Sequence, residues 1–228
     1  MLLSEFQTKL HELYQLDTSV PASTEEDYTI RTNLLETAIN LWAHEEGVTW
    51  RELWTTASGT TGAGSTIPLS SFTDFIFPGG FLRIKLDGTN WTYVPIVDQA
   101  KSELFKNMPS GNNANAAWIT GNKKTGFTVN LTFTVSSGLS WELPYYKDPF
   151  IPSSASDVIE MSDPFFAIYY ALSKLHENDG EGDRATLALQ LADSRLKGMK
   201  FLNGKAPNYQ ENYVPDRDLE LGTPGFGL

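Results

Sequence analysis

Three histidines are each followed directly by a glutamate, which is how the helical motif of zinc proteases begins. They are His11, His44 and His176. In that motif a second histidine, one helical turn later, completes the pair of zinc ligands. The corresponding positions here hold Gln15, Val48 and Gly180. We therefore predict that the chain has no metal ligands and that these histidines lie on solvated helix faces.

Other patterns with chemical potential are also incomplete. The acidic segment 177–183 has the oxygen-rich composition that calcium favours, but it lacks the ligand register and closing glutamate of an EF-hand loop. The chain has no cysteine and no Gly-x-Ser-x-Gly nucleophile elbow. Paired carboxylates such as Asp157 with Glu160 would be needed for an acidic hydrolase, which ranks last among the interpretations. We predict no catalytic residue, no cofactor and no enzymatic activity.

Aromatic side chains of the middle region support a different, non-enzymatic interpretation. Trp91, Tyr93, Trp118 and Trp141 could line one face of a sheet and stack on sugar rings. The chain would then be a carbohydrate-binding β-sandwich module on a helical stalk. The competing interpretation is that these rings fill the core of a small sheet.

Composition limits the classes of partner. The 228 residues carry a formal net charge of -11, and 40% of them are hydrophobic. That hydrophobic content is enough to fill a core, so the chain should fold. Tight nucleic-acid binding depends on clustered Lys and Arg, which this charge disfavours. No apolar stretch approaches the length of a membrane span, so we expect no membrane partner.

Helical periodicity marks both ends of the chain. Apolar residues recur at helical spacing within 3–14, and Ile30, Leu34, Leu35, Ala38, Ile39 and Trp42 predict an apolar stripe on a second helix that ends near Gly47. Ser162-Asp163-Pro164 is typical of a helix start. The stretch 165–200 then predicts an αα-hairpin. On its last helix, one side is expected to carry Ala188, Leu191, Ala192, Leu196 and Met199.

Alternating patterns mark the middle of the chain. Residues 127–135 alternate apolar and polar side chains, which predicts a half-buried strand. Asp87-Gly88 predicts a hairpin turn between 82–86 and 91–97. Residues 141–146 could pair with 127–135, and Pro144 favours an edge or a bend.

These elements predict an α+β fold with a discontinuous helical domain. The expected domain parts are 1–57 and 158–203 for the helices, 58–157 for the insert, and 204–228 for the tail. The fold would be a helical bundle formed by N-terminal helices and a C-terminal αα-hairpin, with an antiparallel β-rich insert and an extended C-terminal tail.

Three stretches resemble the head-to-tail adaptor, or connector, proteins of tailed bacteriophages. Residues 38–53, from Ala38-Ile39-Asn40 to Arg51-Glu52-Leu53, resemble the long helix of that family, and Ile67-Pro68-Leu69 to Phe81-Leu82-Arg83-Ile84 resembles the start of its insert. The stretch from Tyr145-Tyr146-Lys147-Asp148-Pro149-Phe150-Ile151-Pro152 to Asp157-Val158-Ile159-Glu160-Met161-Ser162-Asp163-Pro164 resembles its proline-rich return to the final helices. The insert is larger here than in many members of that family.

The resemblance implies a structural virion protein at the head–tail junction, assembled in the host cytoplasm. Such a protein forms a homo-oligomeric ring, usually a dodecamer, between the portal and a tail or neck component. DNA passes through its lumen without specific binding. The tail that docks on the portal would contain Asp216, Arg217, Leu219, Leu221, Pro224, Phe226 and Leu228.

Overall fold

The chain divides into two compact units, one helical and one strand-rich. The structure, a computed structural model, describes residues 1–14, 19–69, 75–106 and 115–205. The helical unit comprises Met1–Val48 and Ile151–Leu228, and the strand unit comprises Thr49–Phe150. The sequence placed the corresponding boundaries after residues 57 and 157, several residues further along.

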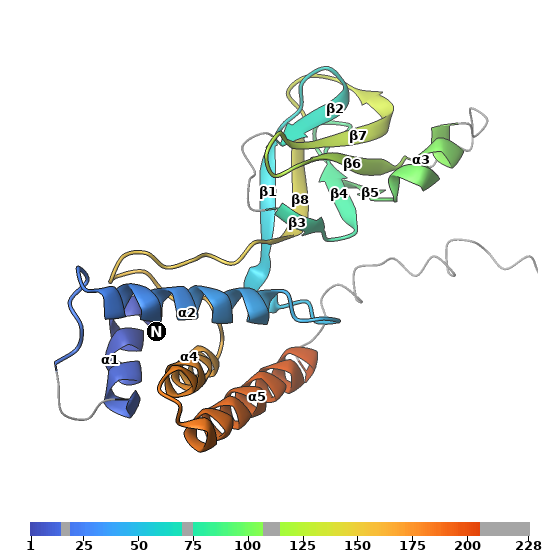
Figure 1. Cartoon of the computed structure of the whole chain (residues 1–228). Helices are drawn as coiled ribbons and strands as arrows, with labels where there is room; N and C mark the ends of the chain where they lie inside the picture. The colour runs from blue at the N-terminus through green and yellow to red at the C-terminus, as the bar shows by residue number, and fades with distance from the viewer. Residues whose placement is uncertain (15–18, 70–74, 107–114, 206–228) are drawn as a thin grey trace, which may run out of the picture. The chain divides into compact units, whose positions relative to one another are not determined.

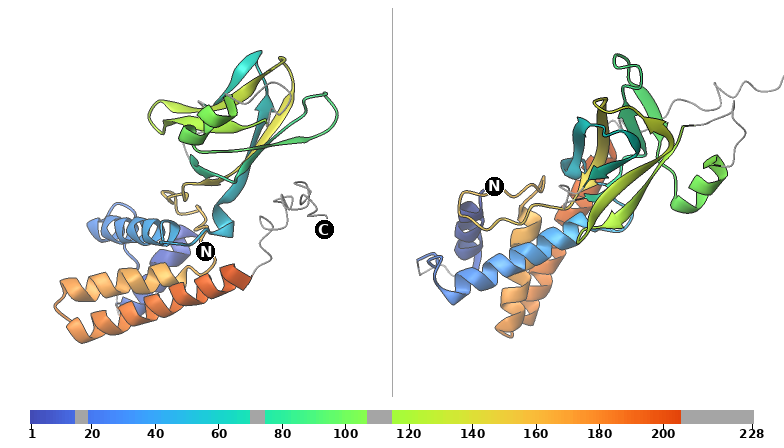
Figure 2. Two further views of the ribbon diagram at one scale, coloured as in Figure 1. Left: turned by 90° about the vertical axis from the view of Figure 1, so that its right-hand side faces the viewer. Right: turned by 90° about the horizontal axis from the view of Figure 1, so that it is seen from above.

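One helix lies at the centre of the helical unit. The helices of this unit are α1 (Leu3–Tyr14), α2 (Glu26–Ala43), α4 (Phe165–Asn178) and α5 (Gly182–Lys205). Helices α1, α2 and α5 each pack against α4, which lies between α2 and α5 (Figures 1 and 2). The buried apolar side chains include Phe6, Leu10, Trp42, Phe166, Ile168 and Ala171. α4 is thus the helix against which the other three helices of this unit bury their apolar side chains.

The start of α1 is held by the chain that returns from the strand unit. The backbone N–H of Leu3 donates to the carbonyl of Asp157 at 2.9 Å, and that of Ser4 donates to Ala155 at 3.1 Å. The N–H groups of a first helical turn have no partner within the helix. The returning segment therefore supplies the hydrogen-bond acceptors that the first turn of α1 lacks.

The strand unit contains two antiparallel sheets. Its strands are β1 (Trp54–Thr60), β2 (Gly64–Leu69), β3 (Phe75–Pro78), β4 (Phe81–Ile84), β5 (Thr92–Pro95), β6 (Ala117–Asn122), β7 (Gly126–Val135) and β8 (Ser140–Lys147). One sheet has the order β1-β8-β4-β5, with β3 also paired to β8, and the other has the order β2-β7-β6. Residues of both sheets share one apolar core, which includes Ile67, Ile84, Val129 and Leu143.

Two local predictions in this unit are confirmed. β7 covers the predicted strand 127–135, and its Val129, Leu131 and Val135 are buried. β4 and β5 pair across the predicted turn, where Gly88 has a φ of 77°. The Asp87 carboxylate accepts hydrogen bonds from the side-chain amide of Asn90 and from the backbone N–H groups of Asn90 and Thr89. In that order of importance, these bonds lower the pKa of Asp87 to about 2.

The predicted pairing of 141–146 with 127–135 is wrong. β8 is a central strand, paired with β1 on one side and with β4 and β3 on the other. Pro144 has no N–H to donate to a neighbouring strand, so it fits best where the pairing is interrupted. On the side of β8 opposite β1, the partner strand changes at Pro144, from β4 opposite Glu142 to β3 opposite Tyr145. The Pro144 carbonyl accepts the N–H of Gly79 at 2.8 Å.

The predicted fold class is also wrong in its arrangement. The described residues form an α+β structure with five α-helices and two antiparallel sheets, and one helix, α3 (Gln99–Lys106), follows β5 inside the strand unit. In place of the expected bundle, the other helices gather on α4, with α1 and α2 running in different directions (Figure 1). Periodicity shows that a helix face is apolar but not which helix will meet it. Of the expected extended tail, 204–228, the first two residues belong to α5, and 206–228 lie outside the described residues.

Gly121 provides a test of the turn between β6 and β7. Its φ is 106°, and an added Cβ would lie 2.2 Å from the carbonyl oxygen of Gly126. We expect Gly121→Ala to lower the free energy of unfolding by about 2 kcal/mol or more, because the backbone strain and the clash act together. Gly62→Ala is the matched control, since no heavy atom lies within 4 Å of its Cβ position. Urea denaturation of both variants compares the two, and equal stability would contradict the described turn.

Candidate functional site

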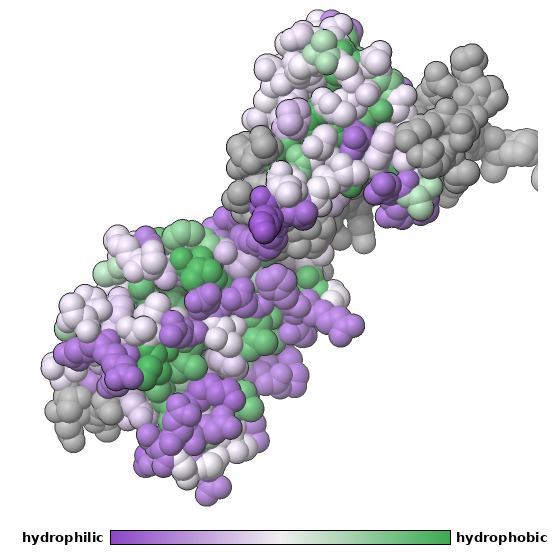
Figure 3. All heavy atoms as spheres, turned by 45° about the horizontal axis from the view of Figure 1, so that its top comes forward, coloured by the Kyte–Doolittle hydropathy of each residue, from purple (hydrophilic) through white to green (hydrophobic). Residues whose placement is uncertain are grey.

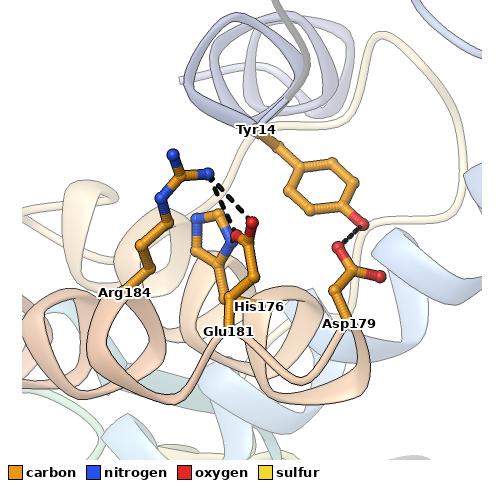
Figure 4. A network of polar contacts seen from close by, with 5 residues as sticks. All are labelled: Tyr14, His176, Asp179, Glu181 and Arg184. Atoms are coloured by element: carbon orange, nitrogen blue, oxygen red, sulfur yellow. Dashed lines mark hydrogen bonds and ion pairs between the residues drawn. The ribbon is translucent and has the colours of Figure 1, made fainter.

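A polar cluster joins the end of α1 to the turn between α4 and α5 (Figure 4). The Tyr14 hydroxyl donates to the Asp179 carboxylate at 2.5 Å. Nδ1 of His176 lies 2.7 Å from the Glu181 carboxylate, whose two oxygens each lie 3.1 Å from Nη1 of Arg184. The rings of Tyr14 and His176 meet edge to face, with centroids 5.6 Å apart. The cluster draws on α1, α4 and α5 together.

The protonation of Tyr14 determines what this cluster can do. Burial and the neighbouring Asp179 carboxylate raise the pKa of Tyr14 to about 12. The hydroxyl therefore stays protonated near neutral pH and acts as a hydrogen-bond donor. This arrangement suits a tie between helices rather than a base or a nucleophile.

A buried arginine continues the cluster towards α2. Arg31 is only 1% exposed, and its Nη1 lies 3.3 Å from Nδ1 of His11. The guanidinium carbon lies 5.9 Å from the centroid of the Tyr14 ring, a cation–π distance. Burial lowers the pKa of Arg31, while the negative charge of Asp27 opposes that effect. The nearby Gln7 amide donates to Thr32 Oγ1 at 3.1 Å.

Four of the six residues predicted for the apolar stripe of α2 are buried, namely Leu35, Ala38, Ile39 and Trp42, but Arg31 was not expected among them. Ile30, predicted to be in the stripe, is 38% exposed. The signal was present in the spacing, since Arg31 falls in line with Leu35, Ala38 and Trp42, which are all buried.

Two ion pairs fix α5 against the rest of the helical unit. Arg195 lies 3.3 Å from the Asp163 carboxylate, and Lys200 pairs with Glu45 just beyond α2. The Arg195 guanidinium also lies 5.5 Å from the centroid of the Phe165 ring. These contacts set which side of α5 faces inward.

A side of α5 next to its buried face exposes large apolar residues. Leu187 is 59% exposed, Leu191 41%, Phe201 61% and Leu202 63%. The placement of Leu191 on the buried side is therefore wrong. The inward side carries Ala188, Ala192 and Met199, and two of these are small enough to let α4 approach closely. Figure 3 shows hydrophobic surface between hydrophilic patches on the helical unit, at the lower left.

The predicted aromatic face does not form. Trp118 is 8% exposed and Trp141 is 4% exposed, so both are buried. Trp91 lies beneath the Lys85 ammonium, 5.0 Å from the centroid of its ring. Tyr93 is 44% exposed and packs against Phe81. The four rings therefore offer no common surface on which a sugar could stack.

Asp157, one of the carboxylates considered for hydrolysis, has a structural role. It accepts N–H groups from Ser153 at 2.9 Å and Ser154 at 2.8 Å, and these hydrogen bonds lower its pKa. Asp157 thereby shapes the turn whose carbonyls receive the start of α1.

All seven residues of the predicted docking tail, within 216–228, lie outside the described residues. Among the residues that the structure describes, no group of three His, Asp or Glu side chains could hold a metal ion. Within the same residues, no helix combines the length and apolarity that a membrane span requires.

Comparison with known proteins adds no relative. No protein-family model matches the chain, and no curated protein matches its sequence significantly.

Replacing Tyr14 tests the polar cluster. We expect Tyr14→Phe to lower the free energy of unfolding by about 1 to 2 kcal/mol at neutral pH, because it removes a hydrogen bond to a charged carboxylate. The folded state raises the pKa of Tyr14, so this contribution is complete below pH ~10. It is lost as the pH rises through about 12.

Urea denaturation over that pH range measures the difference between wild type and Tyr14→Phe. Tyr93→Phe, at a ring that is 44% exposed, serves as the matched control. If Tyr14→Phe is as stable as wild type at neutral pH, the hydrogen bond between Tyr14 and Asp179 does not tie the helices together.

Proposed function

We propose that this chain is a structural virion protein, a head-to-tail adaptor that forms a ring between the portal and the tail. The observation that carries the proposal is the row of exposed apolar side chains on α5, including Leu187, Leu191 and Phe201. Apolar surface of this kind marks sites where other proteins bind. A subunit repeated around a ring covers such surface with its neighbours.

The charge of the chain supports a lumen through which DNA slides. The net charge is -11, and many of the described basic side chains already contact carboxylates. Examples are Arg83 with Glu142, Lys123 with Asp148 and Lys200 with Glu45. Cations held in this way are less available to replace the counterions of a phosphate backbone. Transit without specific binding is the consequence we propose.

The sequence resemblance supports the partners. The stretch from Tyr145 to Pro164, which precedes α4, resembles the return segment of phage adaptors. On this proposal Asp216–Leu228 docks on the portal, with Phe226 and Leu228 as apolar anchors, and a tail or neck component binds at the other end of the ring. Many weak contacts around a ring add to a stable attachment. Assembly takes place in the host cytoplasm, and the finished protein resides in the virion.

Mass measurement tests the ring. Light scattering over a concentration series, with and without the purified portal of the same phage, is expected to show a closed oligomer, nominally a dodecamer. Electron microscopy of that species should show a ring with a central channel. A strict monomer at every concentration, with portal present as well, would count decisively against the proposal.

Deleting residues 222–228 tests the docking tail. We expect an unchanged unfolding midpoint but at least a tenfold weaker attachment to the portal, because each copy loses its apolar anchors. Phe226→Ala should reproduce much of that loss, whereas Thr223→Ala serves as the matched control. Equal portal binding by the truncated and complete chains would refute the tail's role and leave the ring untouched.

A further inference from the structure

α2 carries a second row of residues on the side away from its buried stripe. This outer row of α2 consists of Ile30, Leu34, Thr37 and Leu41, spaced by four, three and four residues. Ile30 is 38% exposed and Leu41 is 48% exposed, while Leu34 is partly buried. Alternating spacings of three and four place side chains along one line of a helix, as in the seam of a coiled coil.

α5 carries a row with the same spacing. This outer row of α5 consists of Leu187, Leu191, Ser194 and Gly198, followed by Phe201 and Leu202. All six residues are exposed. Its small members, Ser194 and Gly198, leave room where a large side chain of another helix can insert.

The two rows belong to different sides of the helical unit. α4 packs against both α2 and α5 and lies between them in the left view of Figure 2. One copy therefore presents two distinct surfaces. Two different surfaces that fit each other produce head-to-tail contacts, and such contacts close into rings when the rotation between copies allows it.

Charge indicates which row meets which. The exposed charged side chains of α2 are all acidic, and two of them, Glu26 and Asp27, lie in the first turn, where the outer row of α2 begins. α5 carries more basic than acidic side chains, Arg184, Arg195, Lys197 and Lys200 against Asp183 and Asp193. Arg184 and Arg195 remain 69% and 48% exposed although each pairs within its own chain. Opposite charges favour α2 against α5, whereas α2 against α2 would bring like charges together.

We propose that the outer row of α2 in one copy packs against the outer row of α5 in the next copy. The occupant of each row is thus a second copy of this chain, arranged head to tail. The pairing deepens the proposed function by assigning its subunit contact, and it rests on that function only for the closure of the ring.

Cross-linking tests the pairing directly, because the natural chain contains no cysteine. Thr37→Cys and Ser194→Cys lie near the middle of their rows, so they face each other whichever way the two helices run. With a short bismaleimide, each variant alone is expected to remain uncross-linked, and an equal mixture should give dimers. A chain carrying both substitutions should give a ladder of larger species.

The matched control uses exposed positions away from the rows. Glu36→Cys on α2 and Asp193→Cys on α5 should give no dimer in the same mixture. A mixture of the control variants that cross-links as well as Thr37→Cys with Ser194→Cys would show non-specific collision and overturn the pairing.

Charge insertion provides the second measurement. Leu41→Glu disables the row of α2 and Leu191→Glu that of α5, both at exposed positions, so folding should be preserved. Each variant alone should lose every species above monomer in light scattering. Mixed together, they should form a single heterodimer through the one intact pair. Assembly of Leu41→Glu alone would instead show that α5 pairs with α5, contrary to the proposal.

The outcomes separate this pairing from the proposed function. Rings without the Thr37–Ser194 cross-link would overturn the pairing and leave the adaptor proposal in place. A cross-linked ladder that never closes would support the pairing and count against the adaptor. If residues 206–228 of the same chain occupy the row of α5, the mixture will give no dimers and the pairing fails.

Discussion

The helical unit depends on hydrogen bonds and packing that form only when the chain returns from the strand unit. Leu3 and Ser4 need the carbonyls of Asp157 and Ala155 to satisfy the first turn of α1, and Ile159 donates to the carbonyl of Met1 at 2.9 Å. α4 then supplies the surface on which α1, α2 and α5 are buried. The orientation of α5, and so its exposed row, follows from that packing.

Features with local causes could be predicted from the sequence. The alternation of 127–135 reports a strand with one buried face, whichever strand lies beside it. The Asp87-Gly88 turn is specified within a few residues, by a side chain that accepts nearby N–H groups and by a glycine at positive φ. The helix over 3–14 is similarly evident from its own spacing.

Features with distant causes could not be predicted. Thr55–Thr66 has the composition of a linker, yet much of it forms β1 and β2, because β8 and β7 supply their hydrogen bonds. Arg31 is buried because His11 and Tyr14 lie beside it, on another helix. Tyr14 likewise meets Asp179 from 165 residues away. Residue spacing within one element carries little information about such partners.

The long pairing of β1 with β8 bears on the order in which the chain folds. Trp54 lies opposite Tyr146, so the strand unit brings its own entry and exit together. Before that pairing, contact between α2 and α4 requires closing a loop of about 120 residues. Once β1 and β8 are paired, only about 30 residues of unpaired chain separate α2 from α4, which lowers the entropic cost of loop closure by about 1 kcal/mol. If the strand unit forms first, its paired ends shorten the loop between α2 and α4, and the helices of the helical unit then meet as they would in a much shorter chain.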